Sequence, residues 1–148
     1  PEGTITRQEF LALVMRTSNL NLSKYKQLSN DWFTREGYLA AAKAYGIITT
    51  SDYGTNYKNL KIYGNITRQE MSVMIGRVLI ANGYSISSKT DYTKNFSDSV
   101  SSKYKTEINL VIKNGILAGY PDGTFKGSRN ASRAEASKMI YKLRKVLG

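Results

Sequence analysis

Apolar residues recur at helical spacing in three similar stretches of the chain. After each of three Arg-x-Glu clusters they stand three or four positions apart, which places them on one face of a helix. They are Phe10, Leu13 and Val14; then Met71, Met74, Ile75 and Val78; then Ala136, Met139, Ile140 and Leu143. The pattern predicts three amphipathic helices beginning after Thr6, Thr67 and Ser132, with the apolar faces and the preceding Ile or Ala in a shared core.

Each of these helices carries a start signal. A hydroxyl residue stands three positions before a glutamate in all three copies, in the pairs Thr6 and Glu9, Thr67 and Glu70, and Ser132 and Glu135. In such a capping box the hydroxyl accepts from the backbone N–H three residues on, and the glutamate reaches back. These six residues are therefore predicted to be structural helix caps, since the spacing needs no ligand to explain it.

Two further segments are predicted to be helical. They are "DWFTREGYLAAAKAYGII", with Trp32, Leu39, Ala42 and Tyr45 available for burial, and "KYKTEINLVIKNGIL", with Tyr104, Ile108, Val111 and Ile112. Each is expected to end at a glycine, Gly46 or Gly115, where a left-handed cap costs little. A turn-rich loop then leads to the next capping box, with Pro-Asp-Gly in the last copy.

The chain therefore reads as internal repeats. The arginines of the three clusters are 61 and 65 positions apart, at Arg7, Arg68 and Arg133, and the agreement between the copies extends beyond the cluster itself into the helix that follows. We divide the chain into the second half of a first repeat (1–20), a second repeat (21–87) and a third repeat (88–148). The predicted fold class is all-α, and the opening helix of the first repeat is expected from an upstream segment or a neighbouring molecule.

Composition and charge narrow the function. The 148 residues are 41% hydrophobic, enough to fill a core. Lysine and arginine number 22 against 11 acidic residues, giving a net charge of +11 and an expectation of an anionic partner: nucleic acid, acidic lipid or acidic cell-wall polymer. The basic residues are scattered rather than gathered in one motif, which disfavours nucleic acid. No apolar stretch is long enough to insert in a membrane.

Catalysis is not expected. The chain has neither cysteine nor histidine, which removes thiolate sites, the usual general base and the commonest metal ligands. The repeated carboxylates stand at capping positions rather than as a catalytic pair. Oxygen ligands are dispersed among caps and turns, so we predict no enzyme activity, no cofactor and no metal site.

The last part of the chain carries a run of four motifs. "FSDSVSSKYKTEINLVIKNGILAGYPDGTFKGSRNASRAEASKMIYKL" contains a Phe-x-Asp opening, a Gly-Ile cap, a Gly-Tyr-Pro-Asp-Gly-Thr-Phe loop and a Ser-Arg-Ala-Glu box. This stretch resembles the S-layer homology (SLH) domain family, in which the box is usually Thr-Arg-Ala-Glu. The first two units are similar mainly through "ITRQE" and the helix that follows. The second unit lacks the Gly-Tyr-Pro-Asp loop, and Gly127 stands where the family favours proline. The resemblance implies helix-loop-helix units in a pseudo-threefold arrangement around a central helical bundle.

The resemblance also implies a function. SLH domains anchor exported proteins noncovalently to an anionic secondary cell-wall polysaccharide, typically a pyruvylated one, so an extracellular place at the bacterial cell wall or S-layer is expected. The export signal is expected outside this sequence. The alternatives are an assembly module that contacts itself or other S-layer subunits and, less favoured, a basic nucleic-acid-binding helical repeat.

Three arginines are the leading ligand candidates under this resemblance. An arginine fork pairs with a carboxylate through charge-assisted hydrogen bonds, and the helix N-terminus also favours an anion. Arg7, Arg68 and Arg133 are thus expected to bind the polymer, and the loss of Arg68 or Arg133 is expected to affect stability little. The alternative is that they are solvated or salt-bridged surface side chains.

The remaining candidates would contact the sugar itself. Asp98 is placed to accept from sugar hydroxyls, with helix capping as its alternative. Trp32 and Tyr120 are possible stacking surfaces, although packing would equally explain them. Gly119 and Gly123 would let the backbone approach the sugar closely.

Overall fold

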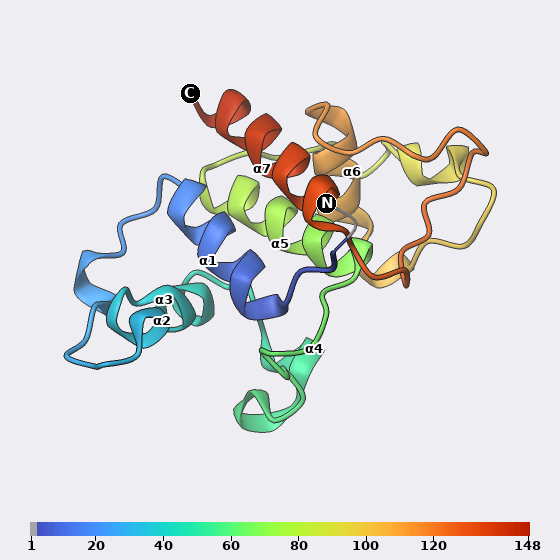
Figure 1. Ribbon diagram of the computed structural model, residues 1–148. Helices are drawn as coiled ribbons and strands as arrows, with labels where there is room; N and C mark the ends of the chain where they lie inside the picture. Colours follow the sequence, from blue (N-terminus) through green and yellow to red (C-terminus); the bar gives the residue numbers. More distant parts are fainter. Residues whose placement is uncertain (1–2) are drawn as a thin grey trace.

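Three long helices lie side by side at the centre of the molecule (Figure 1). The computed structural model describes residues 3–148. The central helices are α1 (Arg7–Thr17), α5 (Arg68–Ala81) and α7 (Arg133–Leu147). They begin where the sequence predicts, and the residues that precede their caps, Ile5, Ile66 and Ala131, are at most 2% exposed.

All three predicted capping boxes are confirmed. The Thr6 hydroxyl accepts from the N–H of Glu9 at 3.1 Å, and the Glu9 carboxylate accepts from the N–H of Thr6 at 3.0 Å. The same reciprocal bonds close the boxes of α5 and α7. Two otherwise unpaired backbone donors are satisfied at the start of each helix.

Shorter helices surround the central three. They are α2 (Trp32–Arg35), α3 (Tyr38–Ala44), α4 (Thr50–Tyr53) and α6 (Lys105–Lys113), with short 3-10 helices at Ser23–Tyr25, Thr55–Tyr57, Tyr92–Asn95 and Ser102–Tyr104. The outer helix α3 packs on α1, and α6 packs on α5. Gly46 and Gly115, with φ of +74° and +73°, follow the ends of α3 and α6 as predicted.

The prediction of one continuous helix from Asp31 to Gly46 is wrong. The segment breaks at Gly37, which has a φ of +76° and would place a Cβ 2.6 Å from the backbone of Tyr25. The segment therefore forms two short helices, α2 and α3. Phe33 of α2 and Tyr38 of α3 are buried, while Trp32 is 42% exposed.

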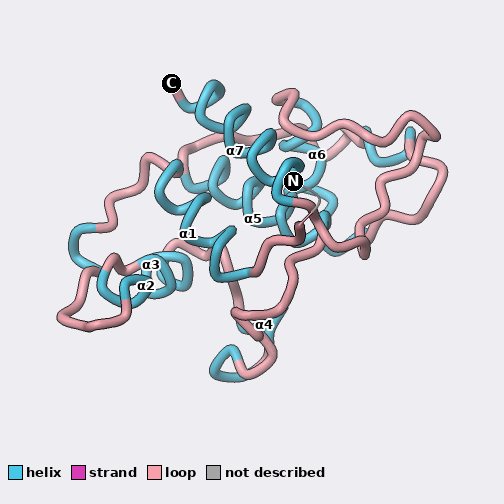
Figure 2. Tube along the Cα trace, in the orientation of Figure 1, coloured by secondary structure: helices cyan, strands magenta, loops and turns pink. Residues whose placement is uncertain are grey.

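The N-termini of the central helices are joined in a closed cycle. The N–H of Arg7 donates to Gly64, that of Arg68 to Arg129 and that of Arg133 to Gly3, at 2.9, 3.0 and 2.9 Å. Each helix thus begins against the segment that leads into another, which repeats the same contact three times. Residues 3–148 contain isolated β-bridges at these junctions but no strand, and Figure 2 shows helices joined only by loops.

Candidate functional site

The motif arginines and capping glutamates form a second cycle around the same helix ends. Every motif arginine pairs with the capping glutamate of another unit. The pairs are Arg7 Nε–Glu70 Oε2 at 2.7 Å, Arg68 Nη1–Glu135 Oε2 at 2.8 Å and Arg133 Nη2–Glu9 Oε2 at 2.7 Å. Each glutamate uses one oxygen for its own cap and the other for this ion pair, so the repeated motif holds the units together.

The three arginines differ greatly in exposure. Arg68 is 5% exposed, and its guanidinium also donates to the carbonyl oxygens of Phe125 at 2.8 Å and Ala118 at 3.4 Å. The side chain of Arg7 is 19% exposed and that of Arg133 is 52% exposed. The burial of Arg68 changes the expectation for its replacement, because breaking a buried pair leaves an uncompensated charge and should lower stability. Arg133 is the most open of the three.

A cavity of about 230 Å³, which we call the third-unit pocket, lies between α7 and the loop after α6. Ile116, Leu117 and Met139 supply apolar lining. The pocket brings together three of the predicted site residues, Arg68, Gly119 and Tyr120, beside Glu135, Lys138 and Lys142.

Lys138 and Lys142 are site residues that the sequence analysis missed. They stand four positions apart on α7, the spacing that puts two side chains on one helix face. Among residues 3–148 neither forms an ion pair. The charged lining of the pocket therefore comprises three cations and one carboxylate, and this excess suits an anionic ligand.

Tyr120 forms a packed wall of this pocket. Its hydroxyl donates to Glu135 Oε2 at 2.7 Å, and the Arg68 guanidinium lies 4.3 Å from its ring centroid. Burial and the bond to Glu135 raise the pKa of Tyr120. Burial raises the pKa of Glu135, but hydrogen bonds from Ser132 and Tyr120 and the charge of Arg68 outweigh it and leave that pKa lowered. Glu135 is thus a carboxylate at neutral pH.

Asp98 fixes the loop that forms the rim of the pocket. Its two oxygens accept from the N–H groups of Phe125 and Lys126, both at 2.8 Å, and these bonds lower its pKa. It does not cap the helix that follows, which was the alternative considered from the sequence. A Cβ on Gly119 would lie 2.6 Å from the Phe96 ring, while Gly123 occupies a turn with a φ of +85°. Both loop glycines are explained by the chain's own packing.

Trp32 lies apart from the third-unit pocket and does not line it. Its ring meets those of Phe33 and Tyr38 edge-on, with centroid separations of 5.6 and 6.2 Å. The structure therefore does not bring the predicted stacking residue Trp32 together with Tyr120.

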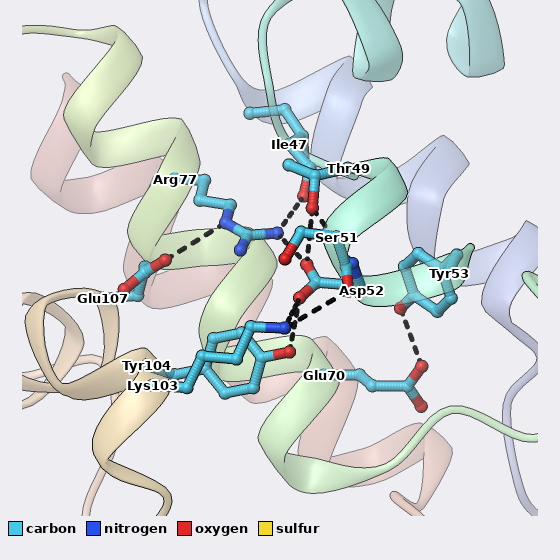
Figure 3. A network of polar contacts seen from close by, with 10 residues as sticks. All are labelled: Ile47, Thr49, Ser51, Asp52, Tyr53, Glu70, Arg77, Lys103, Tyr104 and Glu107. Carbon is cyan, nitrogen blue, oxygen red and sulfur yellow. Dashed lines mark hydrogen bonds and ion pairs between the residues drawn. The ribbon is translucent and has the colours of Figure 1, made fainter. Parts of the chain in front are cut away.

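A smaller cavity of about 120 Å³, the second-unit pocket, lies against α5. Asp52 enters it from α4 and accepts from Arg77 Nη1 at 2.7 Å and from the Tyr104 hydroxyl at 2.5 Å (Figure 3). Lys103 Nζ adds a contact at 3.1 Å, and Arg77 also pairs with Glu107 at 3.2 Å. Burial raises the pKa of Asp52, but these hydrogen bonds outweigh it and lower the pKa to about 2.

Other kinds of site are not seen in the described chain. Within residues 3–148 no group of three or more acidic side chains is placed to hold a metal ion. No helix in the same range has the length and apolar character needed to cross a membrane.

These features define a class of protein, a tandem helical repeat with a cationic surface pocket. Residues 95–137 match the family model of the S-layer homology domain. The third unit is therefore an S-layer homology domain, as its resemblance predicted.

Curated relatives extend the similarity over more of the chain. An amylopullulanase of Thermoanaerobacterium thermosulfurigenes is 30% identical over 97% of this chain and 8% of its own length. The cellulosome-anchoring protein of Acetivibrio thermocellus is 37% identical over 57% of this chain and 19% of its own length. Outer membrane protein SlpA of Deinococcus radiodurans is 44% identical over 26% of this chain and 3% of its own length. The chain thus spans less than a fifth of each of these relatives.

Proposed function

We propose that this chain is a non-catalytic module that binds an anionic cell-wall polysaccharide and so tethers an exported protein to the bacterial envelope. The third-unit pocket carries the proposal, because it joins apolar lining to two lysines of α7 that form no ion pair among residues 3–148, beside a loop that Asp98 holds in place. Support comes also from the S-layer homology match and from a relative named as a cellulosome-anchoring protein.

A pyruvylated sugar suits the chemistry of this pocket. A ketal-linked pyruvate presents one carboxylate on an otherwise polar ring, and Lys138 and Lys142 can neutralise that carboxylate by charge-assisted hydrogen bonds. Arg68 contributes as part of the pocket wall, since its guanidinium is already bound to Glu135 and to two carbonyls. Arg133, with its half-exposed side chain, remains a candidate for a further contact with the polymer.

Two of the relatives are named as enzymes, but their activities are not part of the function that we propose for this chain. The amylopullulanase is matched over 8% of its length, and an exoglucanase, XynX of Acetivibrio thermocellus, over 13%. Such short coverage fits a module shared by large proteins that carry different activities, and we propose no catalysis here.

Binding to purified cell-wall sacculi tests the proposal. The wild-type chain should sediment with intact sacculi, lose binding after acid extraction of the secondary polymer, and bind more weakly as salt rises. The double variant Lys138→Glu, Lys142→Glu should bind poorly. Lys58→Glu, Lys94→Glu is the matched control, because it makes the same charge change at two exposed lysines outside the pocket.

Retained binding to extracted sacculi would contradict the proposal and point to peptidoglycan or a protein as the partner. Self-association without any sacculus binding would favour the alternative of an S-layer assembly module.

A further inference from the structure

The two pockets occupy equivalent positions in the second and third units. A shift of 65 positions, the spacing of Arg68 and Arg133, carries the lining residues of α5 onto those of α7. The matched pairs are Glu70 and Glu135, Met74 and Met139, and Arg77 and Lys142. The hydroxyls of Tyr53 and Tyr120 also donate to the capping glutamate in the same way, at 2.8 and 2.7 Å.

The two matched cations, Arg77 and Lys142, differ in whether they form ion pairs. Arg77 is enclosed by Asp52 at 2.7 Å and Glu107 at 3.2 Å, and it donates to the Ile47 carbonyl at 3.2 Å. Figure 3 shows the Asp52 carboxylate directed at this guanidinium and at the groups of residues 103 and 104. Lys142 forms no ion pair among residues 3–148 and lines the larger cavity.

Glu107 reaches Arg77 from α6, which packs on α5, and a local difference in chain length accounts for the presence of Asp52. Tyr53 lies seven positions after Gly46, whereas Tyr120 lies five positions after Gly115. The segment with the two extra residues forms the short helix α4, and Thr49 caps it by accepting from the N–H of Asp52. The insertion therefore places Asp52 in the second-unit pocket, while the third unit has no such helix.

We infer that Asp52 takes the place of a ligand carboxylate in the second-unit pocket, so that of these two pockets the third-unit pocket alone accepts a carboxylate-bearing sugar, with Lys142 as its partner. The inference rests on the proposed function and specifies the binding residue and which of the two pockets is open to the ligand. The volumes agree with it, since about 120 Å³ remains free beside Asp52 and about 230 Å³ beside Lys142.

Calorimetric titration with the methyl glycoside of a pyruvylated N-acetylated amino sugar tests the role of Lys142. The wild type should bind one equivalent, and Lys142→Ala should weaken binding about tenfold or more through loss of a charge-assisted hydrogen bond. Lys142→Arg should retain binding, since arginine holds a carboxylate at the equivalent position of α5. Lys145→Ala, an exposed lysine of α7 that does not line the pocket, should stay within about twofold of wild type.

Asp52 variants test the other half of the inference. Asp52→Ala removes the carboxylate from Arg77 Nη1 and empties space beside it, while Arg77 Nε stays paired with Glu107, so the number of bound equivalents should rise from one to two. Asp52→Asn removes the charge but keeps the side-chain volume, so the number of bound equivalents should remain one. Thermal melts of each variant establish that the titrated protein is folded.

The two proposals fail in different ways. Absence of wild-type binding to the charged sugar would contradict the proposed function. Wild-type binding that Lys142→Ala leaves unchanged, or a folded Asp52→Ala that still binds one equivalent, would overturn only the inference. If Asp52→Ala unfolds, amide spectra of the wild type decide the point: added sugar should shift the Gly119 signal and leave that of Thr50 unchanged, and the reverse would overturn it.

Discussion

In the second-unit pocket a cation on the central helix is bound by two carboxylates of the chain, whereas the matched cation in the third-unit pocket forms no ion pair within the described residues. Both pockets share the capping box, the tyrosine that donates to its glutamate and the apolar floor. The difference comes from residues outside the repeated motif, namely an inserted turn in one unit and two lysines in the other. The motif builds the scaffold, and the variable positions set the charge and the free volume of each pocket.

The largest effect is expected for the arginine in the wall of the third-unit pocket. Arg68→Ala should lower the free energy of unfolding by about 3–5 kcal/mol, because it breaks a largely buried ion pair with Glu135 and removes the guanidinium donors of two carbonyl oxygens. Arg133→Ala, at the same motif position but half-exposed, should cost about 0–1 kcal/mol. Denaturant unfolding of both variants measures the difference, and equal costs would contradict the contrast in burial.

Loss of the internal carboxylate should have the next largest effect. Asp52→Ala should lower the free energy of unfolding by about 1.5–3 kcal/mol, the scale of hydrogen bonds to a charged group, with Arg77 still held by Glu107. Lys142→Ala, at the matched position and with no ion pair among residues 3–148, should change it by less than about 0.5 kcal/mol. Urea unfolding measures the stability of both variants. A Lys142→Ala protein less stable than the Asp52→Ala protein would contradict the comparison.

Acid should remove the Asp52 network in a defined pH range. The folded pKa of about 2 lies below the ordinary value of 3.8, so the carboxylate stabilises the fold fully above pH 3.8. That contribution declines as the pH falls toward 2, because the unfolded chain then binds the proton more readily. Asp52→Asn should reduce the drop in melting temperature between pH 4 and 2, and an unchanged slope in this variant would contradict the assignment.

The helix caps should show the smallest difference between the units. Thr67→Ala and Ser132→Ala should each cost about 0.5–2 kcal/mol, since each removes one capping bond of the same geometry. Binding should weaken only as far as stability falls. A loss of sugar binding by folded, fully stable Ser132→Ala protein would instead give the hydroxyl a direct role.

Much of the fold could be predicted because its signals are local. The capping boxes, the apolar stripes and the glycines at 46 and 115 depend on residues within one or two turns, and the structure confirms each of them. The break at Gly37 was missed because it depends on a contact with Tyr25, which lies twelve positions earlier in the chain.

The site was harder to predict because it depends on distant pairings. The sequence offered the motif arginines, but their burial is set by glutamates 63 to 124 positions away. Asp98 likewise acts on amides 27 and 28 positions later. Lys138 and Lys142 belong to no motif, and only the third-unit pocket around them distinguishes them from other surface lysines.

A structure of the wild-type chain with a pyruvylated cell-wall fragment bound tests the central claim most directly. The account predicts one fragment in the third-unit pocket, its carboxylate within hydrogen-bond distance of Lys142 Nζ, and the Arg77–Asp52 pair intact. A fragment held in the second-unit pocket, or a carboxylate bound elsewhere with Lys142 unoccupied, would contradict it.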